Sequence, residues 1–164
     1  PTFRVHSPDA KNSNHYPLWH TDSFYGHPPE EVNIWMSLTE NKHSGFYTIS
    51  KEKSLSWIKE YNFNLEKYLE DVFKYKGSEC DFNNKGFDLA KEVPAKTDNI
   101  YLFDSLCIHS ARPRKNDTRI SIDVRINPVD DFIDGYIGTG NTGAKFSPDG
   151  HNGYNKYSIK NSII

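Results

Sequence analysis

Apolar and polar residues alternate along two stretches of the chain, and this alternation predicts two β-strands. In residues 32–38, one side carries Val32, Ile34, Met36 and Leu38, and the other side carries Asn33, Trp35 and Ser37. In residues 119–127, one side carries Ile120, Ile122, Val124 and Ile126, and the other carries Arg119, Ser121, Asp123 and Arg125. A period of two residues is typical of a strand whose two faces meet different surroundings. We expect the apolar face of the second strand to be packed, and its polar face either to meet solvent or to line a polar cavity.

A period close to 3.6 residues appears only later, over residues 64–76. Apolar side chains recur there at i, i+3, i+4, i+7 and i+8, which predicts an amphipathic helix that begins after Asn64 and ends at Gly77. Residues 43–45 are expected to form a turn. Shorter apolar runs predict further strands at residues 46–49, 99–103 and 106–108. Several strands around one helix favour a mainly antiparallel β-sandwich or barrel.

Composition narrows the class of protein. The chain has 164 residues, enough for one domain with a real core, and residues 128–164 are rich in Gly, Asn and Asp, as in a loop-rich C-terminal segment. The 20 basic and 22 acidic residues give a net charge of −2, which argues against a nucleic-acid partner. No apolar run approaches the roughly 18 residues of a membrane span. The two cysteines cannot form a disulfide framework, so we expect a reducing, cytoplasmic location.

Three short motifs carry candidate chemistry. His20 and Asp22 are two residues apart, so on an extended segment their side chains point to the same side, about 7 Å apart. His109 follows an apolar β-prone run, and Arg119 and Ser121 come ten and twelve residues later. Any one of these motifs occurs often by chance, and their combination is more specific.

Together these residue types are the parts of a known kind of metal site. Two histidines and one carboxylate form the facial triad of non-haem Fe(II) oxygenases, which leaves metal positions open for other ligands. The planar fork of an arginine can hold a carboxylate through two hydrogen bonds, and a nearby serine can add a hydroxyl donor. This set matches what is needed to bind 2-oxoglutarate, with its C1 carboxylate and keto oxygen on iron and its C5 carboxylate on the arginine.

On these residues the chain resembles the Fe(II)/2-oxoglutarate-dependent dioxygenases. The string HTDSFYGHPPEEVNIWMSLTE is most similar to their phytanoyl-CoA dioxygenase-like branch and to its streptomycin-biosynthesis StrG-like group, and the likeness extends from about Trp19 to Asn127. The resemblance implies a mainly β double-stranded β-helix, a jelly-roll or cupin-like barrel with one or two supporting helices. It implies that His20, Asp22 and His109 ligate iron, that Arg119 binds 2-oxoglutarate, and that Ser121 assists. It also implies O2 as co-substrate and a polar small molecule, such as a sugar or amino-sugar derivative, as substrate.

Other residues are candidates for the pocket or for contacts beyond the ligands. These are Tyr25, His27, Asn33, Trp35 and Arg125. For Asn33 and Trp35, ordinary cross-strand packing is an equally good interpretation. His27 lies between Gly26 and Pro28, where a structural role is the more usual one. Asp123 and Arg125 are expected either to pair with each other across the strand, which is the favoured interpretation, or to bind a polar substrate.

Two alternative functions fit part of the pattern. A cupin-like isomerase or epimerase would use the metal and the barrel without 2-oxoglutarate, and it would have no need of Arg119 and Ser121. A non-catalytic β-sandwich binding module would leave His20, Asp22 and His109 apart. Convergence of these three side chains is therefore the structural observation that separates a binding module from the oxygenase and from the cupin-like enzyme.

Overall fold

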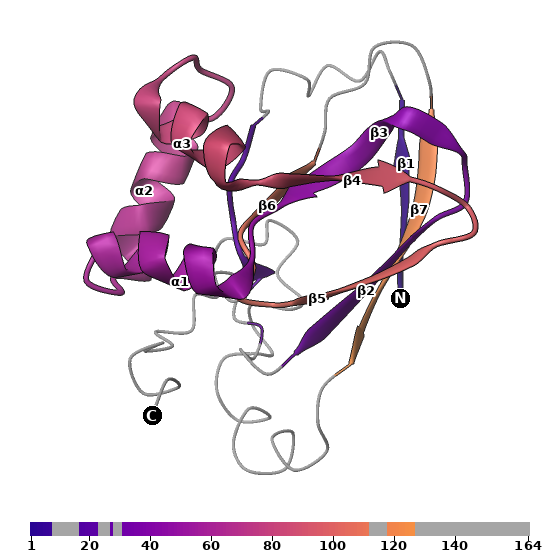
Figure 1. Cartoon of the computed structure of the whole chain (residues 1–164), viewed down its shortest axis with the longest axis horizontal. Coiled ribbons are helices and arrows are strands. Elements are labelled where there is room, and N and C mark those ends of the chain that lie inside the picture. The colour runs from indigo at the N-terminus through magenta and orange to yellow at the C-terminus, as the bar shows by residue number, and fades with distance from the viewer. Residues whose placement is uncertain (8–16, 23–26, 28–30, 112–117, 127–164) are drawn as a thin grey trace.

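The computed structural model of the chain describes residues 1–7, 17–22, 27, 31–111 and 118–126 (Figure 1). Within these residues the fold is mainly β, with two antiparallel sheets and a group of three helices at one side. The strands are β1 (Thr2–His6), β2 (Val32–Ser37), β3 (Asn41–Thr48), β4 (Lys91–Ala95), β5 (Ile100–Asp104), β6 (His109–Ala111) and β7 (Arg119–Ile126). The helices are α1 (Lys51–Glu60), α2 (Leu65–Tyr75) and α3 (Asp81–Leu89). The expectation of one or two helices was therefore too low.

The two sheets place segments that are distant in sequence beside each other. The larger sheet has the order β1-β7-β2-β5, and the smaller has the order β4-β3-β6. In the larger sheet Asn33 of β2 lies opposite Arg125 of β7 on one side and Phe103 of β5 on the other. Within the described residues these sheets remain two separate sheets and do not close into one barrel.

The side of the larger sheet that faces the smaller one is here called the inner face. Trp35 of this face packs against Phe46 of β3 and Tyr101 of β5, with ring centroids 5.0 and 5.7 Å away, and Ala95 of β4 completes this core. On β2 the inner side chains Asn33, Trp35 and Ser37 are all buried. The polar side of the alternating pattern is thus the buried side.

The opposite side, here called the outer face, is apolar, half-buried along its middle and exposed at its edges. Its members are Phe3, Val5, Val32, Ile34, Met36, Ile100, Leu102, Ile120, Ile122, Val124 and Ile126, which the strand register places opposite one another. Phe3 is 61% exposed, Leu102 66% and Ile126 53%. The expectation that the apolar face of residues 119–127 is packed was therefore wrong for the described residues. The polar side chains of β7 lie on the inner face instead, and three of them, Arg119, Asp123 and Arg125, line the pocket described below.

The three helices enclose a second core. Helix α2 confirms the sequence prediction: the Asn64 side chain accepts a hydrogen bond from the Lys67 backbone N–H, and Gly77 has a φ of 69°, which favours glycine. The buried members of this core are Trp19, Ile49, Trp57, Ile58, Tyr68, Leu69, Val72, Leu106 and Ile108. Gly86 of α3 lies so close to Trp19 that a Cβ there would come within 2.2 Å of the indole ring. No helix among the described residues is long and apolar enough to cross a membrane.

Two local predictions were wrong. Residues 43–45 lie inside β3, not in a turn, and residues 106–108 precede β6 as a turn. Leu106 and Ile108 are apolar because they are buried in the helical core, and the Ile108 N–H donates to the Ser54 hydroxyl (2.9 Å). The consequence is that β6 begins at His109, so the backbone of this residue is fixed by strand pairing.

Candidate metal centre

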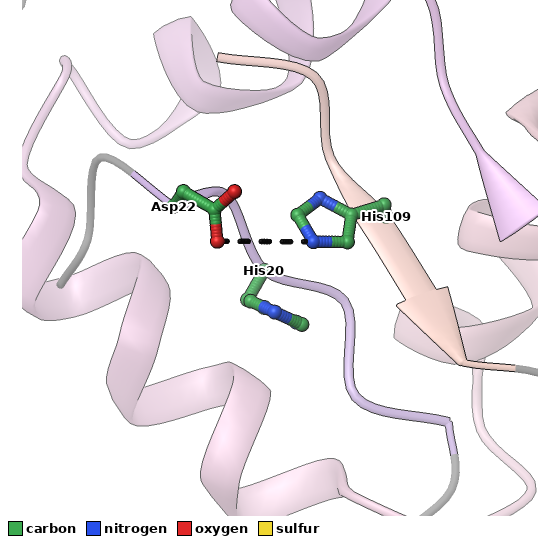
Figure 2. A group of neighbouring side chains, drawn as sticks. All are labelled: His20, Asp22 and His109. Atoms are coloured by element: carbon green, nitrogen blue, oxygen red, sulfur yellow. Dashed lines mark ion pairs between the residues drawn. The ribbon is translucent and has the colours of Figure 1, made fainter. Parts of the chain in front are cut away.

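His20, Asp22 and His109 converge on one point (Figure 2). One potential ligand atom from each residue lies within 4.8 Å of the others. The two histidines are joined through their backbones, since His20 N–H donates to His109 O (3.1 Å) and His109 N–H donates to His20 O (2.8 Å). Their rings lie 4.3 Å apart between centroids. Strand-like pairing thus holds a segment near the N-terminus against β6 and brings both imidazoles to the same place.

The same hydrogen-bond pattern orients both imidazole rings. His20 Nδ1 lies 3.0 Å from the Leu18 carbonyl oxygen, and His109 Nδ1 lies 2.9 Å from the Cys107 carbonyl oxygen. A carbonyl oxygen only accepts hydrogen bonds, so Nδ1 carries the proton in each ring and Nε2 keeps its lone pair. This is the arrangement in which a histidine that ligates a metal is fixed by a backbone acceptor.

Electrostatics favour the protonation states that a metal needs. Burial, together with the neighbouring His109, lowers the pKa of His20 from 6.5 to about 3. Burial acts to raise the pKa of Asp22, but His109, Arg125 and His20 outweigh it and hold the pKa of this carboxyl well below its usual range. At neutral pH His20 is therefore neutral and Asp22 is ionised, as metal ligation requires.

A pocket of about 110 Å³ opens over this group. Of the residues that the sequence indicated, it is lined by His20, Asp22, Asn33, Trp35, His109, Arg119 and Arg125. The other lining residues are Arg4, His6, Phe46, Phe103, Ala111 and Asp123, and Ile34, an outer-face residue between Asn33 and Trp35, also borders the pocket. The polar face of β7 therefore lines a cavity, which was one of the two alternatives. Tyr25 lies outside the described residues, and the structure does not bring His27 or Ser121 to the pocket wall.

Arg119 and Ser121 lie next to each other on the inner face of β7. The Arg119 guanidinium is 3% exposed, donates to the Gly45 carbonyl oxygen (2.5 Å) and lies 5.5 Å from the centre of the Trp35 ring. Gly45 is required here, because a Cβ would come within 1.5 Å of the Val93 carbonyl oxygen on β4. The Ser121 hydroxyl is buried and has no hydrogen-bond partner among the described residues. A buried arginine beside an unsatisfied buried hydroxyl is chemically suited to a carboxylate ligand.

The expected pairing of Asp123 with Arg125 was wrong. Asp123 forms an ion pair with Arg4 of β1, and Arg125 forms ion pairs with Asp22 and Glu31. Side chains at i and i+2 of one strand are about 7 Å apart, whereas neighbours across the sheet are closer. Asp123 and Arg125 therefore each pair with oppositely charged residues on neighbouring segments.

Sequence reasoning missed Glu31. Its side chain is 1% exposed, and Oε1 lies 2.9 Å from His27 Nδ1 and 3.3 Å from Arg125 Nε. His27, a candidate for a substrate contact, is instead engaged by this carboxylate. The only sequence signal was a pair of glutamates directly before an alternating strand, and surface glutamates are common at such positions.

Comparison with known proteins gives one short match. No model of a known protein family matches the chain. A stretch of 39 residues, 24% of this chain, is 51% identical to the streptomycin biosynthesis protein StrG of Streptomyces griseus. The stretch covers 18% of that protein. The chain therefore shares a local likeness with a biosynthesis protein, and the described structure contributes a cluster of His20, Asp22 and His109 that could hold a metal ion.

Proposed function

We propose that this protein is a non-haem Fe(II)/2-oxoglutarate-dependent oxygenase that hydroxylates or oxidises a polar small molecule. The observation that carries the proposal is the convergence of His20, Asp22 and His109 at a pocket that Arg119 also lines. Two nitrogens and one carboxylate oxygen form the donor set of the facial triad. The fixed Nδ1 protons, the ionised Asp22 and the unsatisfied Ser121 hydroxyl are observations that fit both the metal and 2-oxoglutarate.

Each residue has a stated task in this proposal. His20, Asp22 and His109 would hold Fe(II). Arg119 would bind the C5 carboxylate of 2-oxoglutarate, and Ser121, which lies beside Arg119 on β7 but not at the pocket wall, would assist it. When bound, Fe(II) and 2-oxoglutarate supply the oxidation of a substrate C–H bond with O2 as oxidant. The aromatic side chains Phe46 and Phe103 form an apolar wall of the pocket and reduce the access of water to it.

The fold and the short match support the finer parts of the proposal. Two antiparallel sheets with the site between them fit a double-stranded β-helix of the jelly-roll or cupin-like kind. The likeness to a streptomycin biosynthesis protein favours a sugar or amino-sugar derivative as the substrate class. This assignment of substrate is by analogy.

Anaerobic titration tests the proposal directly. Fe(II) and then 2-oxoglutarate are added to the protein, and the weak visible charge-transfer band of the chelate is recorded. We expect the band in the wild-type protein and in His6→Ala, which removes another histidine of the pocket wall. We expect no band in Asp22→Ala and a much higher 2-oxoglutarate requirement in Arg119→Ala.

The other results point to the alternatives. Metal binding without any effect of 2-oxoglutarate would favour a cupin-like isomerase or epimerase and would contradict the oxygenase. Absence of metal binding in the wild-type protein would favour a non-catalytic binding module.

A further inference from the structure

We propose that Asn33 and the buried pair Arg125–Glu31 are positioning residues that present only one carboxylate oxygen of Asp22, Oδ1, to the metal. The inference rests on the proposed metal centre and concerns residues that lie behind its ligands. A carboxylate can bind a metal through one oxygen or through both, and the second mode occupies one more coordination position. A site that must accept 2-oxoglutarate and O2 needs those positions.

Asn33 occupies the oxygen that points away from His109. Its side chain is 5% exposed on the inner face of β2, and its Nδ2–H donates to Asp22 Oδ2 at 2.6 Å. The other oxygen, Oδ1, is the one that faces His109 Nε2, at 4.0 Å (Figure 2). A buried, short hydrogen bond to an ionised acceptor is among the stronger hydrogen bonds in proteins. Oδ2 is therefore taken by a strong donor, whereas Oδ1 accepts only a longer hydrogen bond from Arg125 and is the oxygen that a metal would use.

Arg125 approaches the same carboxylate from the neighbouring strand. It lies directly opposite Asn33 in the β2–β7 register, and one terminal nitrogen is 3.4 Å from Asp22 Oδ1. A guanidinium close to that oxygen would compete with a cation for it. At 3.4 Å this hydrogen bond is long for a charge-assisted one, and it is weaker than the 2.6 Å hydrogen bond from Asn33 to Oδ2.

Glu31 forms a second ion pair with Arg125. Its Oε1 lies 3.3 Å from Arg125 Nε, and only 1% of the residue is exposed. A buried carboxylate beside the guanidinium offsets its charge, so that a second cation can occupy the space near Asp22. Without Glu31, the positive charge of Arg125 would be balanced by Asp22 alone, and the metal would lose part of its ligand.

A purely structural role for these residues would have different consequences. It would lower the stability of the fold when a residue is replaced, but it would leave the coordination of the bound metal unchanged. The number of water molecules on the metal is therefore the decisive measurement, because it reports how many positions the protein occupies. Mn(II) serves as the probe, since its electron paramagnetic resonance signal broadens measurably in ¹⁷O-labelled water.

The experiment compares Asn33→Leu and Asn33→Ala with the wild-type protein, in buffer with Mn(II) alone. Both variants remove the donor to Oδ2, Leu at similar volume and Ala as the second variant should Leu disturb the fold. We expect each variant to hold one fewer water on Mn(II) than the wild type, because the released Oδ2 becomes a second ligand. In Glu31→Gln we expect Mn(II) affinity to fall by about 10- to 100-fold, the range typical for residues behind metal ligands. The double variant Glu31→Gln/Arg125→Gln should recover part of that loss.

The outcomes separate this inference from the proposed function. If the wild type binds Mn(II), and neither the water number nor the affinity changes in the variants, the positioning inference is wrong while the metal centre stands. If the wild type and Asp22→Ala bind Mn(II) equally weakly, the metal centre itself is wrong, and this inference fails with it. A loss of one water in the Asn33 variants, together with reduced Mn(II) affinity in Glu31→Gln, supports both the metal centre and the positioning inference.

Discussion

The two faces of the larger sheet reverse the usual relation between polarity and burial. Antiparallel sheets commonly pack an apolar face on the core and expose a polar one. Here the inner face buries Asn33, Arg119 and Ser121, while the outer face exposes Phe3 and Leu102. The comparison teaches that polar groups can occupy the inner face because they line or adjoin a cavity, since isolated polar groups are costly to bury. The outer face is a contiguous apolar surface, and such surfaces are associated with association or packing partners.

The largest expected difference between the faces is in stability. Phe46→Ala removes an aromatic ring that packs against Trp35 and Phe103 beneath the inner face, and we expect it to cost about 3–5 kcal/mol of the free energy of unfolding. Phe3→Ala removes a ring of the outer face that is 61% exposed, so the cost should stay below about 1 kcal/mol. Urea denaturation of the two variants and the wild type measures both. Equal costs would show that the outer face is packed in solution.

The second difference is in ligand binding, and it compares adjacent residues of one strand. Arg119→Ala should weaken 2-oxoglutarate binding by about 100-fold, because charge-assisted hydrogen bonds from a buried guanidinium contribute roughly 1.5–3 kcal/mol each. Ile120→Thr alters the outer face one residue away and should leave the affinity within about twofold of the wild type. Calorimetric titration in the presence of Mn(II) checks the pair. Similar losses in the two variants would mean that the effect comes from the strand and not from the guanidinium.

The third difference is in how stability depends on pH, which we expect to involve the site and not the outer face. The pKa of His20 is lowered to about 3 in the folded protein, so between this value and 6.5 the unfolded chain binds a proton that the folded chain does not. Stability of the metal-free protein should therefore fall as the pH falls below 6.5, by up to about 1.4 kcal/mol per pH unit for this one proton. Asp22, whose pKa is also lowered, adds to the loss only as the pH falls below about 3.8.

Urea midpoints at pH 7.5, 6.5, 5.5 and 4.5, measured with a chelator present, test this dependence. His20→Asn should show a shallower decline than the wild type. Ile100→Thr, on the outer face, should keep the wild-type slope. A wild-type slope in His20→Asn would assign the acid sensitivity to other groups.

The smallest expected effect is the change in stability caused by substitutions on the outer face. Ile100→Thr and Leu102→Ser, two residues that are 63% and 66% exposed, should each change stability by no more than about 0.5 kcal/mol. Together they should reduce concentration-dependent association, because they shorten a contiguous apolar surface. Light scattering over a concentration series measures this. A large loss of stability would indicate that the face is covered.

Strands and helices were predictable where the sequence period was clear. Residues 119–126 and the helix after Asn64 follow from period and capping alone. Alternation specifies a strand but not which face is buried, so the reversal of β2 and β7 could not be predicted from it. Helix α3 contains two asparagines and a glycine, which have low helix propensity, and it is stabilised by packing on Trp19.

The convergence of the three candidate residues was predictable, and the surroundings of the site were less so. His20, Asp22 and His109 were grouped from their spacing and from a family resemblance, and the structure brings them together. The partners of Asp123 and Arg125 depend on strand register, which the sequence did not fix. Glu31 could not be singled out, because a glutamate beside another glutamate looks like a solvated residue until its burial is known.

The close approach of Gly45 to β4 has a consequence for protein engineering. Residue 45 contributes to the position of Arg119 through a main-chain carbonyl oxygen, which no substitution at that residue can delete. Any side chain at position 45 would clash with the Val93 carbonyl oxygen, so saturation mutagenesis of the pocket would record this position as intolerant. Such a result would not reveal the contact between the Gly45 carbonyl oxygen and Arg119. Changes at Val93, whose carbonyl lies against Gly45, would instead shift the hydrogen-bond acceptor of Arg119, and they offer a way to adjust this guanidinium without altering any residue of the pocket wall.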